Sequence, residues 1–129
     1  MNEPQWLSIA VLLAIHDEVL AAHGGLPGLR DAAALESAMA RPRNIFEYHR
    51  GDLFDLAAAY AGGIVRNHPF ADGNKRAGFL AAYVFLAVNG QDLEAPEPDV
   101  VITVFGLAAG EIPESRFAAW LRANSVPII

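Results

Sequence analysis

The 129-residue chain contains no cysteine, and only one of its nine basic residues is a lysine. Without cysteine the chain cannot form a disulfide framework, a cysteine-ligated zinc site or a thiol nucleophile. This absence is consistent with a reducing cytoplasm, which is the location we expect. The net charge of −6 and the pI near 5.0 argue against direct, sequence-independent nucleic-acid binding, because such binding requires a basic face.

Long hydrophobic runs are absent as well. The longest nonpolar run, residues 77–88, is too short for a membrane span of about 20 residues. The apolar stretch at the N-terminus has no basic region before it, so we expect no signal peptide and no membrane association. The 53% hydrophobic and 19% charged composition is typical of a folded protein, and no linker or repeat divides the chain. We therefore expect one domain over residues 1–129.

The pattern of apolar residues and helix-capping residues predicts helices and no sheet, so the expected fold class is all-α. Ser8, Asp31 and Asp52 are candidate N-caps, and the Arg41-Pro42 pair is expected to end the second helix. The segment 44–51 has no helical period and is expected to be extended. The twelve-residue nonpolar run predicts a central helix that is buried on all sides. The expected helices cover about residues 8–22, 32–40, 53–67, 73–88, 98–109 and 113–123.

The loop before the fourth expected helix contains polar residues with complementary chemistry. Asp72 can cap this helix, and the free N–H groups of Gly73, Asn74 and Lys75 would then form an anion site at the positive end of the helix dipole. Lys75 and Arg76 add positive charge that suits phosphate oxygens. The helix start therefore predicts a phosphate-binding site.

Two further groups in this loop predict chemistry as well as binding. Asp72 supplies an oxygen ligand for Mg²⁺, which typically binds one or two carboxylates together with substrate phosphates. His68 can act as a general base toward a hydroxyl. Each residue alone could simply cap a helix, but together they supply a base, a metal ligand and an anion site. The sequence therefore predicts group transfer from a nucleotide.

Residues 68–76 resemble the signature of the Fic fold superfamily, His-x-Phe-x-(Asp/Glu)-Gly-Asn-(Gly/Lys)-Arg. Members that transfer AMP usually have glycine where this chain has Lys75, and a second arginine where it has Phe79. The lysine form is similar to the death-on-curing (Doc) toxins. Weaker matches, which extend the similarity over about residues 8–125, are His16-Asp17, residues 24–28, Arg30-Asp31, Leu53 and Asn89-Gly90.

The resemblance implies a compact Fic-fold bundle of about six helices with a short flap, which phosphorylates a protein hydroxyl with ATP and Mg²⁺. In the Doc family the target is elongation factor Tu, and the result is arrested translation. Segment 44–51 matches the position of the family's flap, which aligns the target. The resemblance assigns His68 as the base, Asp72 as the Mg²⁺ ligand, Gly73, Asn74 and Lys75 as the anion hole, and Arg76 as the contact to the transferred phosphate.

Regulation is expected to come from a second protein. Many Fic proteins carry an inhibitory helix with the pattern Ser/Thr-x-x-x-Glu-(Gly/Asn), and no serine or threonine here has glutamate at the fourth position. The Doc resemblance therefore implies a Phd-like antitoxin whose C-terminal segment folds on binding, in an apolar groove near the first helix.

Other activities remain open from the sequence. AMP transfer is one alternative, and a catalytically inactive Fic-fold binding module is another. An acyltransferase with a His-x-x-x-Asp-Gly motif requires two large lobes, which 129 residues cannot supply. The acidic balance and the single histidine at the site argue against a ribonuclease toxin.

Residues outside the motif have simpler interpretations. We expect His16 to be buried and hydrogen-bonded to the backbone, His23 to be a cation at a helix end, and Trp6 and Trp120 to anchor the core. For Arg66, helix-dipole complementation and phosphate contact both remain open. For Tyr48 and His49 in the presumed flap, target contact and simple exposure remain open.

Overall fold

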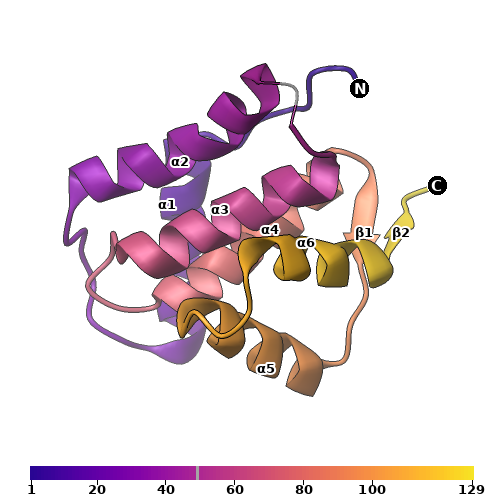
Figure 1. Cartoon of the computed structure of the whole chain (residues 1–129). Coiled ribbons are helices and arrows are strands. Elements are labelled where there is room, and N and C mark those ends of the chain that lie inside the picture. The colour runs from indigo at the N-terminus through magenta and orange to yellow at the C-terminus, as the bar shows by residue number, and fades with distance from the viewer. Residues whose placement is uncertain (49) are drawn as a thin grey trace.

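The computed structural model describes residues 1–48 and 50–129, so the interpretation of His49 lies outside the described residues. Within these ranges no helix combines the length and the apolar character needed to cross a bilayer. The chain order, which Figure 1 shows from indigo to yellow, is α1 (Ile9–His23), α2 (Ala32–Glu47), α3 (Leu53–Asn67), α4 (Asn74–Val88), β1 (Gln91–Leu93), α5 (Glu97–Ala108), α6 (Glu114–Ala123) and β2 (Ser125–Pro127).

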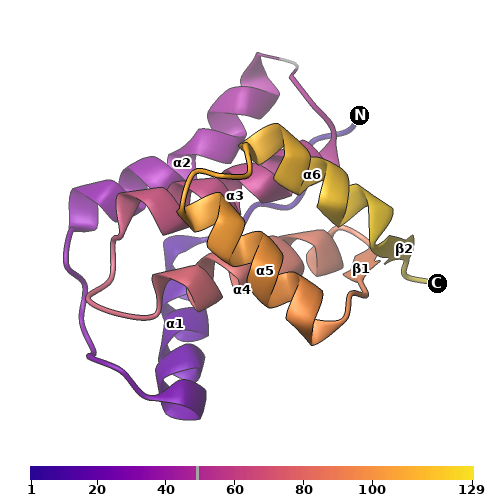
Figure 2. The same ribbon diagram turned by 60° about the horizontal axis from the view of Figure 1, so that its bottom comes forward.

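The fold is all-α, as expected, apart from one short strand pair. β1 and β2 run antiparallel, with Asp92 opposite Val126. β1 precedes α5 and β2 follows α6, so the strand pair connects the start of the segment that contains α5 and α6 to its end (Figure 2). The sequence did not indicate these strands, because each has only three residues and no alternating pattern can develop over that length.

The helix at the centre of the bundle is α3, with α2, α4 and α6 around it in both views (Figures 1 and 2). Every residue from Leu56 to Val65 is buried. The prediction that α4 is buried on all sides was wrong. One face of α4 is buried, but Phe79, Leu80 and Tyr83 on its other side are only half-buried and line a cavity.

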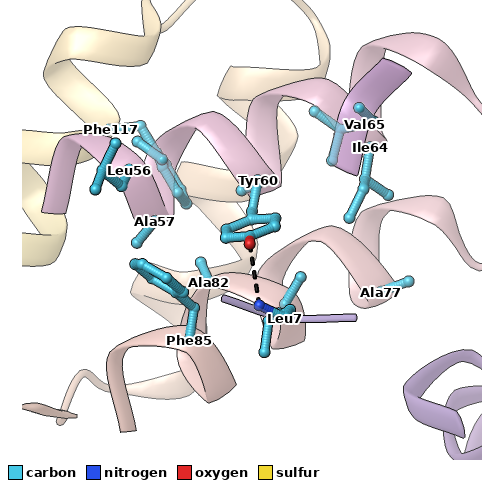
Figure 3. Packing of buried hydrophobic residues seen from close by; sticks show 14 of the residues in the cluster. Leu7, Leu56, Ala57, Tyr60, Ile64, Val65, Ala77, Ala82, Phe85 and Phe117 are labelled. Atoms are coloured by element: carbon cyan, nitrogen blue, oxygen red, sulfur yellow. Dashed lines mark hydrogen bonds between the residues drawn. The ribbon is translucent and has the colours of Figure 1, made fainter. Parts of the chain in front are cut away.

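The core brings aromatic residues of separate segments together, among them Tyr60 of α3 and Phe85 of α4 (Figure 3). The Tyr60 hydroxyl on α3 accepts a hydrogen bond of 3.1 Å from the Leu7 backbone N–H, and the Tyr60 ring lies 5.0 Å from that of Phe85 on α4. Trp6 stacks on Phe85 at 6.0 Å, while Trp120 packs against the core from α6. The two tryptophans are therefore core anchors, as predicted.

The predicted N-caps of the first three helices are confirmed. The side chains of Ser8 and Asp31 accept hydrogen bonds from the N–H groups three residues further on. Asp52 does the same at α3, where Asp55 completes a capping box. These local signals fix where α1, α2 and α3 begin.

The predicted end of α2 was wrong, because α2 continues through Pro42 to Glu47. A proline inside a helix costs about 3 kcal/mol through its missing N–H and its steric clash. Packing offsets this cost: Pro42 is buried, and Ile45 and Phe46 pack against the core. Each such apolar side chain contributes roughly 1.5–3 kcal/mol when it is fully buried. Residues 44–47 are consequently helical and not extended.

Candidate active site

The polar motif occupies the turn from α3 to α4, and His68 has an unusual backbone conformation there. Its φ is +48°, and it is the only described non-glycine residue with a positive φ. Such a conformation costs roughly 1–3 kcal/mol unless its surroundings hold it. Arg30 supplies this restraint, since its Nε donates to the His68 carbonyl at 2.6 Å and its second nitrogen donates to the Asn67 carbonyl at 2.8 Å. The exposed imidazole is thereby presented at the end of α3.

The side chain of Asn74 connects His68 to the rest of the turn. Asn74 is buried; its Oδ1 accepts from the Phe70 N–H at 3.0 Å, and its Nδ2 donates to the Phe70 carbonyl at 3.0 Å. Because the Phe70 N–H requires an acceptor, this pair fixes the orientation of the amide. Nδ2 then lies 3.3 Å from Nδ1 of His68. From the sequence, Asn74 was expected to contribute its backbone N–H to the anion site, and this function of its side chain was not predicted.

The Asn74 contact also has a chemical consequence. When Nδ1 of His68 accepts a hydrogen bond, the neutral ring carries its proton on Nε2. For Nε2 to act as the base, the neutral ring must instead carry its proton on Nδ1. The hydrogen bond from Asn74 to Nδ1 therefore has to break when a hydroxyl binds at Nε2.

The start of α4 differs from the starts of α1, α2 and α3. The predicted cap at Asp72 was wrong. Gly73 is the N-cap with φ +79°, and no side chain of the described residues caps this helix. The Asp72 carboxylate instead accepts from the Gly73 N–H at 2.9 Å and from the Leu26 N–H at 3.3 Å. The first-turn N–H groups of residues 74–76 therefore remain available to an anion.

A cavity of about 710 Å³ runs from this helix start along the groove between α4 and α5. Lys75 reaches toward the opposite wall, where its Nζ lies 5.1 Å from the centre of the Phe105 ring. His23, in the last turn of α1, also lines the cavity. All the site residues predicted from the motif line this one cavity: His68, Asp72, Gly73, Asn74, Lys75 and Arg76.

The exposed Asp72 carboxylate fits a shared Mg²⁺ site. Its two oxygens offer about four lone-pair positions, of which the two N–H groups use two. Among the described residues no group of three histidine, cysteine, aspartate or glutamate side chains could hold a metal. A single carboxylate is the protein contribution that Mg²⁺ needs when phosphates supply further oxygens.

Outside the motif, His16 behaves as predicted, and Arg66 lies in the last turn of α3, which fits helix-dipole complementation, one of its two expected roles. His16 is buried, its Nε2 donates to the Asp72 carbonyl at 2.8 Å, and its ring stacks on Phe70 at 3.7 Å. Arg66 pairs with Glu114 of α6 at 3.5 Å and does not line the cavity, so the phosphate-contact interpretation is wrong.

The predicted flap at 44–51 was also wrong. The described residues 44–48 and 50–51 precede the start of α3, whereas the motif follows the other end of this helix (Figure 1). A 15-residue helix is roughly 22 Å long. The segment beside the motif is residues 26–31. Its Arg30 and Asp31 N–H groups donate to the Pro69 carbonyl, and its Gly28 carbonyl accepts from Ala71. The glycine-rich run before Arg30 was the available signal for this contact.

Comparison with known proteins agrees with the site. The Fic/DOC family model matches residues 6–86, which is more than half of the chain and includes the whole motif. The chain is 36% identical over 112 residues to "Protein kinase doc" of Escherichia phage P1, covering 86% of this chain and 88% of that protein. It is 42% identical over 78 residues to "Toxin Doc" of Mycolicibacterium smegmatis, covering 57% and 58%. The chain therefore belongs to the Fic/Doc family.

Proposed function

We propose that this protein is the toxin of a type II toxin–antitoxin system and that it phosphorylates a protein hydroxyl with ATP and Mg²⁺. The relatives named as a protein kinase and as a toxin support this assignment. One observation supports it most directly: an exposed histidine, an exposed carboxylate and an uncapped helix N-terminus line the same cavity. These are the components that phosphoryl transfer requires, since its catalysis depends mainly on positioning and charge stabilisation.

The proposed reaction assigns one task to each group. The target hydroxyl oxygen attacks the γ-phosphorus of ATP, the bond from that phosphorus to the bridging oxygen breaks, and ADP leaves. His68 accepts the hydroxyl proton. The N–H groups at the start of α4, with Lys75 and Arg76, stabilise the phosphate oxygens. Asp72 would hold Mg²⁺ together with the phosphates, and the metal would supply further neutralisation of negative charge.

The target is proposed to be elongation factor Tu, so that translation stops and the protein acts in the cytoplasm. The 26–31 segment is the place where a target chain can align with the motif. Its Leu26 and Leu29 side chains are exposed, and its backbone already pairs with the loop at Phe70. An extended target segment can add to this edge through main-chain hydrogen bonds.

The proposed partner in regulation is a Phd-like antitoxin whose C-terminal segment folds on binding. Exposed apolar side chains lie on α1, at Ile9, Val11 and Leu13, and on α5, at Ile102 and Phe105. Phe105 also lines the cavity, so a segment that covers α5 would close access to Lys75. Such apolar faces are typical of surfaces that receive a folding peptide.

The test is transfer of label from ATP to purified elongation factor Tu, with the radioactive phosphate at either the α or the γ position. We expect label on the target from the γ position alone. Label from the α position alone would establish AMP transfer, the alternative activity. No transfer of either label would favour the inactive binding module. His68→Ala should lower the rate by about 10²–10⁴-fold. Arg76→Ala should also lose activity, whereas Arg66→Ala, an arginine that does not line the cavity, should retain it.

A further inference from the structure

The turn that follows α1 packs directly on the Asp72 carboxylate. The Leu26 N–H donates to Oδ2 of Asp72 at 3.3 Å. Gly25, with φ +120°, brings its backbone so close that an added Cβ would lie 2.9 Å from Oδ2 and 3.2 Å from Cγ of Asp72. It would also lie 3.2 Å from a methyl group of Leu20, whose flexible end can move aside. Contact at 2.9 Å cannot persist, so one of the two groups must shift.

The least costly shift is a rotation of the Asp72 side chain. The Asp72 backbone is held by the His16 ring, which donates to its carbonyl at 2.8 Å, and by the start of α4 that follows. The carboxylate, by contrast, is at the exposed end of a short side chain. Rotation would break the bond from Leu26 and would turn the free lone pairs away from their present direction.

We propose that Gly25 is a positioning residue: its lack of a side chain lets the turn close on Asp72, and the Leu26 N–H then fixes the carboxylate in the pose that binds Mg²⁺ with the nucleotide phosphates. This inference rests on the proposed role of Asp72 as the Mg²⁺ ligand. Partners that orient a metal ligand in this way typically change metal affinity or activity by 10–100-fold when they are altered.

Gly24 provides a matched control for Gly25. It precedes Gly25 in the same turn and also has a positive φ, +74°, but an added Cβ there would meet nothing within 4 Å. Gly24→Ala and Gly25→Ala therefore both carry the backbone strain of alanine at positive φ. Only Gly25→Ala adds the contact with Asp72.

The experiment measures binding of ATP by calorimetry, with and without Mg²⁺, in a His68→Ala background in which transfer is expected to be about 10²–10⁴-fold slower. We expect Gly25→Ala to weaken MgATP binding by about 10–100-fold and to leave binding of metal-free ATP within about threefold. Gly24→Ala should leave both within about threefold of the parent. Equal losses of MgATP binding in the two variants, or a loss that is the same without Mg²⁺, would overturn the proposal.

A second measurement keeps the test decisive if Gly25→Ala does not fold. In the amide NMR spectrum, Asp72→Ala should move the Leu26 proton upfield, because that proton loses its carboxylate acceptor; an unmoved signal would overturn the proposal. A different result would refute the proposed function. A His68→Ala parent that binds no MgATP would refute the nucleotide site itself, whereas a parent that binds MgATP and is insensitive to Gly25→Ala would refute only the role of Gly25.

Discussion

The buried amide of Asn74 should contribute measurably to folding as well as to catalysis. Its two hydrogen bonds to Phe70 satisfy a backbone N–H and a backbone carbonyl of a residue that is only 1% exposed. In Asn74→Ala both groups lose their partner. A buried polar group without a partner costs about 1–3 kcal/mol, so for two groups we expect the free energy of unfolding to fall by about 2–6 kcal/mol.

This loss should appear as a lower melting temperature. For a domain of this size 1 kcal/mol corresponds to roughly 3–5 °C, so the midpoint of Asn74→Ala should lie at least about 6 °C below that of the unmodified protein. Circular dichroism at 222 nm on heating measures the midpoint directly. Transfer activity should fall too, because the turn that carries His68 loses the two bonds that anchor it at Phe70.

His68→Ala is the matched control for this prediction. His68 is exposed, and its ring makes one 3.3 Å contact with Asn74, so its removal should shift the midpoint by less than about 2 °C while it abolishes transfer. The two variants should therefore be alike in activity and different in stability. If Asn74→Ala melts at the temperature of the unmodified protein, the bonds to Phe70 do not stabilise the turn and the reasoning is refuted.

Two further predictions concern the scaffold. Burial tends to raise the pKa of Asp52, but hydrogen bonds from Arg122 and from the Asp55 backbone outweigh it and lower the pKa to about 2. The stability from this ionised group is therefore complete above about pH 4 and is lost as the pH falls from about 4 toward 2. The difference in midpoint between the unmodified protein and Asp52→Asn should be largest at pH 7 and shrink toward pH 2, and a constant difference would contradict the assignment. At Gly78 an added Cβ would lie 2.8 Å from Cγ1 of Val65, so Gly78→Ala should destabilise by about 1–3 kcal/mol in urea unfolding. Helix propensity alone predicts a gain of up to about 1 kcal/mol, and an observed gain would show that α3 and α4 can separate freely.

The parts of the fold that the sequence predicted well are those with local causes. Ser8, Asp31 and Asp52 cap helices through side-chain bonds that span three residues, so their positions can be recognised without knowledge of the fold. The candidate site residues are similar, since they follow one another within a single turn. The extension of α2 past Pro42 depends on burial against other helices, and no local pattern contains that information.

The features of the site that the sequence did not reveal are contacts between distant segments. Arg30 reaches the His68 carbonyl across 38 positions, and Leu26 reaches Asp72 across 46. The flap was placed at the wrong end of α3 because the sequence shows the order of segments but not which end of a helix they approach. The Asp72 cap was misplaced by one residue because Gly73 adopts a positive φ.

Residues 125–127 of β2 do not line the cavity, but they pair with β1, which leads into one of its walls. β1 leads into α5, which forms one wall of the cavity, and the Leu93 side chain at the end of β1 is itself part of the lining. β1 is held in place by β2, and the adjoining Ile128 N–H donates to the Gly90 carbonyl. We expect that shortening or tagging the chain near Val126 would loosen α5 and alter the width of this cavity. A screen for loss-of-toxicity mutations should therefore recover changes in this last strand as well as in the motif, and an affinity tag is better attached to the N-terminus.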